Sequence, residues 1–213
     1  NMTACMLATS LGAKKTVARI DNYEYLLPKH KEFFAKLGVH SLIYPEMLAA
    51  RDIVDAVKMS WIRQWWEFAG GALVLLGTKN IPYIRKISGK ENEADVRNVM
   101  IMGGSRIAVR TVQYMPDYMK AKIIESNIAR CNRLTELVDD GVMVINGDGR
   151  DMQLLMEEGI KNTEAFVALT GNSETNILAC LAAKRMGVTK TVAEVENVDY
   201  ISMAESLDIG TVI

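Results

Sequence analysis

Mainly apolar runs of four or five residues alternate with amphipathic segments over the C-terminal half of the chain. These runs have the length and character of buried strands, and they cover residues 99–102, 121–124, 142–145, 166–169 and 191–195. The segments between the runs carry apolar residues at helical spacing, and short turns connect them. Strands that alternate with helices in this way predict an α/β fold with a Rossmann-like, doubly wound parallel sheet.

The first sixty residues show the same alternation. The predicted elements are helices at 1–11, 22–37 and 45–58 and strands at 16–20 and 39–43. A glycine follows each of the first two helices, at Gly12 and Gly38, where a left-handed residue commonly ends a helix. This segment is therefore also expected to be α/β in character.

The start of the chain repeats a segment near its end. Residues 1–25 match residues 176–200 at a constant offset of 175, without a gap. Identical pairs include Asn1 and Asn176, Cys5 and Cys180, Gly12 and Gly187, Val17 and Val192, and Tyr25 and Tyr200. Because chance rarely keeps register over such a length, the match indicates an internal repeat.

The repeat sets the expected domain organisation. Residues 97–213 form a second, nucleotide-binding Rossmann-like unit, residues 1–60 are the C-terminal part of a first such unit, and residues 61–96 connect the two. Since no strand–turn–helix half precedes the first copy, the helix at 1–11 is expected to expose an apolar face. That face predicts oligomerisation or a separate covering segment.

The connecting segment begins with four aromatic residues, Trp61, Trp65, Trp66 and Phe68. Such a cluster can anchor an interface between proteins, or it can cap the core beneath the preceding helix, which is the interpretation we favour. A strand is predicted at 73–76. The charged residues 89–98 are typical of an exposed linker.

The best candidate for a functional site lies between residues 99 and 125. A buried strand leads into Gly103-Gly104-Ser105-Arg106-Ile107-Ala108, a helix follows, and a second strand ends at Glu125. This is the order of a dinucleotide-binding βαβ unit, in which a tight glycine turn brings backbone N–H groups and a helix N-terminus to a pyrophosphate. The acid about 20 residues further on accepts hydrogen bonds from a ribose.

The turn departs from the usual G-x-G-x-x-G spacing, because its three glycine positions hold Gly103, Ser105 and Ala108. Ala108 is an accepted small residue at the third position. The Ser105 side chain either takes space that a pyrophosphate needs or donates its hydroxyl to a phosphate. The alternative is that Gly103-Gly104 forms only a tight turn between a strand and a helix, and the motif alone leaves both interpretations open.

Polar residues at the ends of the next two strands are further candidates, because such ends line the ligand crevice of an open α/β sheet. Asp148 is expected to accept a hydrogen bond from an adenine amine or a ribose hydroxyl. It can instead cap the following helix, in competition with Asp151. Thr170 and Asn172 are placed either to reach the ligand or to cap the helix that follows them.

Composition narrows the classes of function. The formal net charge is −1 and no basic stretch stands out, which argues against nucleic acid as a partner. Only two histidines are present, so a histidine-based metal site or a Ser-His-Asp triad is not expected. Three widely spaced cysteines fit a reducing cytosol. We find neither a signal peptide nor an apolar run of about 18 residues.

Several of these residues together resemble a known family. The turn at 101–108, Glu125, Asn146-Gly147-Asp148, the stretch FVALTGNSETN at 166–176 and Gly187 look like the N-terminal domain of RCK (regulator of potassium conductance) proteins, the TrkA-N domain. The tandem arrangement is similar to the TrkA family, the cytosolic regulatory (gating) subunits of Trk-type potassium uptake systems.

The resemblance implies a function, a ligand and a partner. Members of the family bind NAD(H) or adenine nucleotides at the βαβ turn, assemble as dimers or tetramers, and couple nucleotide state to a membrane-embedded potassium channel subunit. For this chain it implies a non-enzymatic role in potassium transport, in the cytoplasm and peripheral at the inner face of the cell membrane. NAD(H) is the cofactor that we expect first, followed by ATP or ADP.

The resemblance also assigns the cofactor contacts by position. They are Gly103, Gly104, Ser105, Arg106, Ile107, Ala108, Glu125, Ser126, Arg130, Gly147, Asp148 and Thr170. The chain departs from the family at Ser126-Asn127, where a second acid or polar pair is usual. Family members carry a small β-rich domain after each unit, and residues 61–96 are expected to be a remnant of that region with a linker.

Two alternatives remain open at this stage. An NAD-dependent oxidoreductase would need a proton donor such as a His, Lys or Tyr near the turn, and no recognisable motif supplies one. A degenerate Rossmann module kept for assembly alone would have lost its ligand, and Ser105 at the second glycine position favours this interpretation.

Overall fold

The computed structural model describes the chain except for residues 59–65, 69–70, 74–95 and 208. The described part divides into two compact units, Asn1–Ala49 and Ala50–Ile213. Helix α3 (Pro45–Lys58) runs across the division between them.

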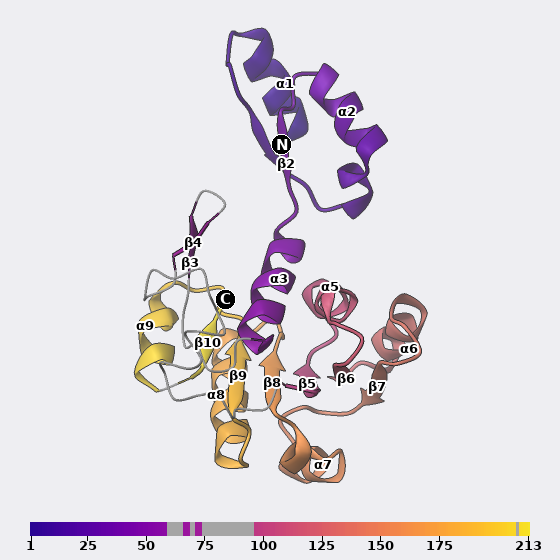
Figure 1. The fold of residues 1–213 in the computed structure, drawn as a ribbon, viewed down its shortest axis with the longest axis vertical. Coiled ribbons are helices and arrows are strands. Elements are labelled where there is room, and N and C mark those ends of the chain that lie inside the picture. Colours follow the sequence, from indigo (N-terminus) through magenta and orange to yellow (C-terminus); the bar gives the residue numbers. More distant parts are fainter. Residues whose placement is uncertain (59–65, 69–70, 74–95, 208) are drawn as a thin grey trace. The chain divides into compact units, whose positions relative to one another are not determined.

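The second unit is built on a six-stranded parallel sheet with the strand order β10-β9-β8-β5-β6-β7 (Figure 1). Its strands are β5 (Asn98–Met102), β6 (Lys120–Glu125), β7 (Met143–Asn146), β8 (Ala165–Ala168), β9 (Lys190–Ala193) and β10 (Thr211–Val212). The chain adds β6 and β7 on one side of β5 and then crosses over to add β8, β9 and β10 on the other. This order reverses beside β5 and confirms the predicted doubly wound parallel sheet.

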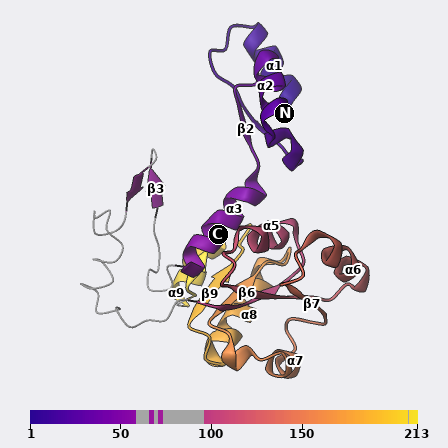
Figure 2. The ribbon, with the colours of Figure 1, turned by 45° about the vertical axis from the view of Figure 1, so that its right-hand side comes forward.

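Helices cover both faces of this sheet. The described helices are α5 (Arg106–Tyr114), α6 (Ile128–Leu137), α7 (Met152–Glu157), η2 (Ile160–Asn162), α8 (Ser173–Arg185) and α9 (Asp199–Ser206). Figure 2 shows α5 and α6 on one side of the sheet and α7 and α8 on the other. Because side chains of a strand alternate between faces, Ile101 packs in the cluster with α5, α6 and the end of α3, whereas Met100 packs with α7, α8 and α9.

The first unit has a smaller parallel sheet of two strands, β1 (Val17–Arg19) and β2 (Ser41–Ile43). Helix α1 (Met2–Ser10) precedes β1, and η1 (Tyr23–Leu26) and α2 (Pro28–Lys36) connect the two strands. A short antiparallel pair, β3 (Trp66–Phe68) and β4 (Gly71–Leu73), follows α3 in the sequence.

The sequence repeat is also a repeat of hydrogen bonds. Asn176 donates to the carbonyl of Glu194 at 2.9 Å, and its counterpart Asn1 donates to the carbonyl of Arg19 at 3.4 Å. The thiols of Cys180 and Cys5 donate to the carbonyls of Val192 and Val17, in both cases at 3.4 Å. The glycines that end the two helices, Gly187 and Gly12, have φ values of 102° and 100°. The same sequence therefore gives the same local helix–strand geometry in both units.

The two copies differ in what covers them. In α8 the side chains of Asn176, Ile177, Cys180 and Ala183 are buried against β8, β9 and their neighbours. In α1 no residue is buried, and Leu7 is 61% exposed. This matches the exposed helix expected for residues 1–11.

Three sequence predictions need correction or fall outside the described residues. The single helix predicted at 22–37 is wrong, because Pro28 lacks an N–H and holds Leu27 extended, so η1 ends and α2 begins there. Of the strand predicted at 73–76, only Leu73 is described, as part of β4 (Gly71–Leu73), and residues 74–76 lie outside the described residues. Trp61, Trp65 and the linker residues 89–95 lie outside the described residues, as does any side-chain role of Trp66 and Phe68.

Among the helices that the structure describes, none is both long enough and apolar enough to cross a membrane.

Asn176 offers a stability test with a control built into the chain. Its side chain is fully buried, accepts from the Thr170 N–H and hydroxyl, and donates to the carbonyls of Thr170 and Glu194. Asn176→Ala strands these buried groups, so we expect it to lower the free energy of unfolding by roughly 2–4 kcal/mol. Asn1→Ala removes one exposed 3.4 Å bond and should cost no more than about 0.5 kcal/mol. Urea denaturation followed by circular dichroism measures the free energy of unfolding of both variants. Equal losses would contradict a larger stabilising role for Asn176 than for Asn1.

Candidate nucleotide-binding site

A cavity of about 270 Å³ opens at the carboxyl ends of the parallel strands in the second unit. It is lined by Met102, Gly103, Ser105, Ile124, Glu125, Ser126, Arg130, Asp148, Gly149, Arg150, Leu169, Thr170, Gly171 and Thr175. These residues follow β5, β6, β7 and β8, the four strands on either side of the point where the strand order reverses. This is where ligands bind in open α/β sheets.

The turn after β5 requires both of its glycines. Gly103 has a φ of +99°, and a Cβ there would stand 2.7 Å from the carbonyl oxygen of Leu169. A Cβ on Gly104 would collide with the side chain of Leu134 and stand 3.1 Å from Oε2 of Glu125. The glycines are therefore needed to bring the turn close to β8, α6 and Glu125, whether or not a ligand is bound.

Ser105 is the N-cap residue of helix α5. Its backbone is extended, and its hydroxyl oxygen accepts from the N–H of Ala108 at 3.3 Å. A capping serine satisfies one of the N–H groups that a helix start leaves without an internal partner. Ser105 also lines the cavity.

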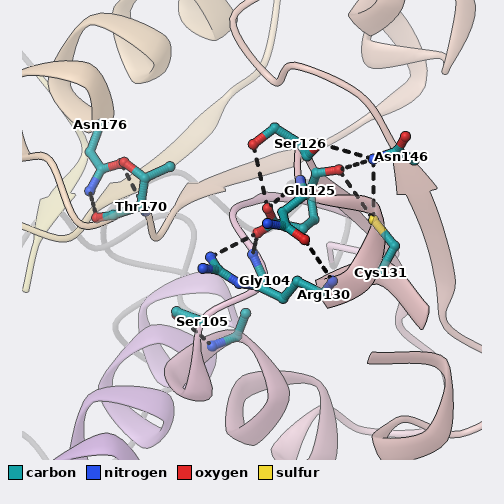
Figure 3. Close-up of polar contacts among 11 residues, drawn as sticks. Gly104, Ser105, Glu125, Ser126, Arg130, Cys131, Asn146, Thr170 and Asn176 are labelled. Carbon is teal, nitrogen blue, oxygen red and sulfur yellow. Dashed lines mark hydrogen bonds and ion pairs between the residues drawn. The ribbon is translucent and has the colours of Figure 1, made fainter. Parts of the chain in front are cut away.

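Glu125 ends β6 and binds the surrounding loops together (Figure 3). Its Oε2 accepts from the Gly104 N–H at 2.8 Å, and its Oε1 accepts from the Asn127 N–H at 2.8 Å. Two longer bonds come from exposed or half-exposed side chains, the Ser126 hydroxyl at 3.4 Å and Arg130 Nη1 at 3.3 Å. The backbone bonds hold the carboxylate in place, and the longer pair can give way to the hydroxyls of a ribose.

These contacts also determine the charge of Glu125. Burial on its own raises the pKa of this carboxyl, since it disfavours the ionised form. The N–H groups of Asn127 and Gly104 and the guanidinium of Arg130 outweigh burial and lower the pKa below its ordinary value. Glu125 is therefore a buried carboxylate that stays charged at neutral pH.

The Asn146 side chain holds the backbone at Glu125 and Ser126 in place. Its side-chain amide donates to the carbonyl of Glu125 at 3.0 Å and to the carbonyl of Ser126 at 3.1 Å. The buried thiol of Cys131 donates to the same Glu125 carbonyl at 3.2 Å. The ends of β6 and β7 and the start of α6 are thus joined at one point (Figure 3).

Thr170 and Asn176 fix the other wall of the cavity. The Thr170 hydroxyl donates to Oδ1 of Asn176 at 2.6 Å, and Asn176 also bonds both backbone groups of Thr170. Asn172 caps α8 by accepting from the Thr175 N–H at 2.7 Å. Of the two residues expected either to line the site or to cap the helix, Thr170 therefore lines it and Asn172 caps.

Asp148 is occupied by an ion pair. Both of its carboxylate oxygens accept from the guanidinium of Arg150, with Nη2 2.7 Å from Oδ2 and Nε 2.9 Å from Oδ1. These bonds lower the pKa of the Asp148 carboxyl. Asp151 caps α7 by accepting from Gln153 and Leu154. The alternative that Asp148 caps this helix is not observed.

The structure brings most of the residues proposed from the sequence to the cavity. Those that line it are Gly103, Ser105, Glu125, Ser126, Arg130, Asp148 and Thr170. Gly104, Arg106, Ile107, Ala108 and Gly147 do not line it. Gly104 instead holds Glu125, Ala108 is buried in the core, and Arg106 is exposed at the start of α5.

Sequence reasoning missed Gly149, Arg150 and Thr175, which also line the cavity. Arg150 lies two residues after Asp148 in the loop that follows β7. This position near a strand end could have identified Arg150 as a candidate site residue from the sequence. The contact between Thr170 and Asn176 was harder to predict from the sequence, because it joins a turn to the first part of the next helix.

Comparisons with known proteins identify the family and support the fold. A family model described as the TrkA-N domain matches residues 99–213. The Trk system potassium uptake protein TrkA of Halomonas elongata is 36% identical over 270 aligned residues, which cover 100% of this chain and 59% of that protein. The protein of the same name from Haemophilus influenzae is 27% identical, over 96% of this chain and 57% of its own length. The chain thus spans somewhat over half the length of these relatives.

Solved structures support the fold. The crystal structure of the GsuK RCK domain matches with a TM-score of 0.65 at 14% identity, over 100% of this chain and 56% of that one. A GsuK channel bound to NAD matches with the same TM-score and identity, over 46% of its length. At these identities the likeness concerns the fold alone. Since the family model covers more than half of the sequence, the chain belongs to the TrkA-N domain family.

Proposed function

We propose that this chain is the nucleotide-sensing part of a regulatory (gating) subunit of a Trk-type potassium uptake system. It binds NAD(H), with ADP or ATP as the next candidates, at the carboxyl edge of the sheet in its second unit. Nucleotide occupancy then controls a membrane-embedded potassium channel subunit. The TrkA relatives and the NAD-bound and ADP-bound GsuK structures support this proposal through their names and their fold.

One observation carries the ligand assignment. The buried, charged carboxylate of Glu125 lines an open cavity and is held against the glycine turn by the Gly104 N–H. A carboxylate at this strand end accepts hydrogen bonds from a ribose 2′-hydroxyl, and the same negative charge repels a 2′-phosphate. The site should therefore prefer NAD(H) to NADP(H).

Gating requires that the nucleotide prefers one state of the assembly. A ligand shifts an equilibrium only by the difference between its affinities for the two states. We propose that the chain acts as a homo-oligomer, a dimer or tetramer, on the cytoplasmic face of the membrane, peripheral to the channel subunit. The exposed apolar residues of the first unit, such as Leu7 and Leu11, fit a role in such an assembly.

The two alternatives from the sequence are less well supported. None of the described residues that line the cavity is a His, Lys, Tyr or Cys, so an oxidoreductase would lack its usual proton donor there. A degenerate module without ligand would explain the loop contacts of Glu125, but not the cavity that this carboxylate lines together with the ends of three other strands. We therefore propose a binding function without catalysis.

Glu125→Gln tests the ligand site directly. The variant keeps the size of the side chain, loses its charge and replaces one acceptor oxygen with an NH2 group that cannot accept from the Gly104 or Asn127 N–H. For both reasons we expect NAD, NADH and ADP to bind more weakly by roughly 1–3 kcal/mol. Isothermal titration of the full chain measures these affinities. Glu136→Gln, an exposed acid of α6 outside the cavity, is the control and should bind like the wild type.

The selectivity of the site gives a second readout from the same titrations. NADP should bind the wild-type chain at least tenfold more weakly than NAD, and Glu125→Gln should narrow that gap. Wild-type protein that binds no nucleotide, or that prefers NADP, would refute the proposed function.

Arg106 is the test of phosphate recognition. It is the first residue of α5, exposed at the helix end that attracts anions, although it does not line the cavity itself. We expect Arg106→Ala to weaken ATP more than ADP, and ADP more than adenosine, with about 1 kcal/mol lost for ATP at low salt. An equal loss for adenosine would rule out a phosphate contact.

A further inference from the structure

The loop after β7 presents a guanidinium to the cavity. Arg150 bonds Asp148 along one edge of its planar group, through Nε and Nη2, while the Arg150 backbone N–H donates to Asp148 Oδ1 at 2.9 Å. Among the described residues, no hydrogen bond involves its Nη1. The side chain is 68% exposed and lines the same cavity as Glu125. Asp148 therefore holds one edge of the planar cation, and the exposure of the side chain leaves the plane accessible to a ligand.

Strand order predicts which part of a nucleotide lies at this loop. The glycine turn that suits phosphates follows β5, and the ribose-binding Glu125 ends β6, the next strand in the sheet. Phosphate, ribose and base follow one another along a nucleotide. The base therefore lies beyond β6, at the end of β7, where Asp148, Gly149 and Arg150 line the cavity.

The backbone of this loop is held against the floor of the cavity. A Cβ on Gly149 would collide with the side chain of Met102, the last residue of β5. Gly149 is also buried. The loop therefore packs against the end of β5 at Gly149, between the two residues of the ion pair.

Asp148 has little capacity left for a ligand. Its two oxygens accept four bonds from Arg150, three from the guanidinium and one from the backbone. For Asp148 to accept from an adenine amine, as expected from the sequence, Arg150 would have to leave. The group that faces the base is therefore the guanidinium and not the carboxylate.

We propose that Arg150 binds the base of the nucleotide by stacking its guanidinium plane on the ring, and that Asp148 is a positioning residue that holds this plane. The inference rests on the proposed nucleotide-binding function and deepens it. Arginine stacks on flat aromatic groups through its delocalised charge, which lysine cannot reproduce. Because every base has such a face, this contact adds affinity with little choice between purines.

The test compares ligands that share a base and differ in phosphates. We expect Arg150→Ala to weaken adenosine, ADP and ATP by the same factor, roughly tenfold, in isothermal titrations of the full chain. Arg150→Lys should lose nearly as much, because it keeps the charge and loses the plane. Arg133→Ala, an exposed arginine of α6 outside the cavity, is the matched control and should bind like the wild type.

A double-mutant cycle tests the role of Asp148. Asp148→Asn should weaken binding less than Arg150→Ala does, and the double variant should bind no worse than Arg150→Ala alone, since the two residues act as one unit. ADP and GDP should differ by less than about threefold in the wild type.

Four results would overturn the assignment of Arg150. They are a loss that grows with the number of phosphates, full rescue by Lys, tighter binding in Arg150→Ala, and a larger loss in Asp148→Asn than in Arg150→Ala. Each of them presupposes that the wild-type chain binds nucleotide and so leaves the proposed function intact. Wild-type protein without nucleotide binding would instead end both proposals.

Discussion

The Glu125 carboxylate is the interaction on which the site depends. It joins the glycine turn after β5, the end of β6 and the start of α6 through two backbone N–H groups at 2.8 Å. Hydrogen bonds to a charged group contribute about 1.5–3 kcal/mol each, and leaving buried N–H groups without a partner costs a similar amount. The same carboxylate thus stabilises the loops and presents a negative charge to the cavity, so structure and ligand recognition cannot be separated at this residue.

The repeat separates two effects: local sequence determines the helix–strand geometry, and the surrounding structure determines how deeply that geometry is buried. Asn1 and Asn176 make the same type of bond to the following strand, and both helices end at a left-handed glycine. Yet Asn176 is fully buried within a network that includes Thr170, whereas Asn1 is exposed. The local geometry follows from the residues themselves, while the stability gained from it depends on the β8 strand and the neighbours that cover the second copy.

Two residues that were ambiguous in the sequence illustrate how packing assigns roles. Ser105 was expected to obstruct a pyrophosphate or to bind one, and it caps α5 and lines the cavity. Asp148 was expected to contact the ligand or to cap α7. Asp151 caps α7, and both oxygens of Asp148 accept from Arg150 at the edge of the cavity. In each case the deciding contact involves a residue two or three positions away, whose direction depends on the backbone of the turn.

Apolar runs and turn glycines were sufficient to predict the five main strands, the parallel doubly wound sheet and the position of Gly103 and Glu125, because strand and helix periodicity are local properties. They were not sufficient for the break at Pro28 or for β10, which is only two residues long. The sequence predicted a crevice at the strand ends, but its full lining was decided by the tertiary structure, since the cavity is formed where four strand ends meet. Arg150, Thr170 and Glu125 are distant along the chain, and the crossover from β7 to β8 brings them to one edge of the sheet.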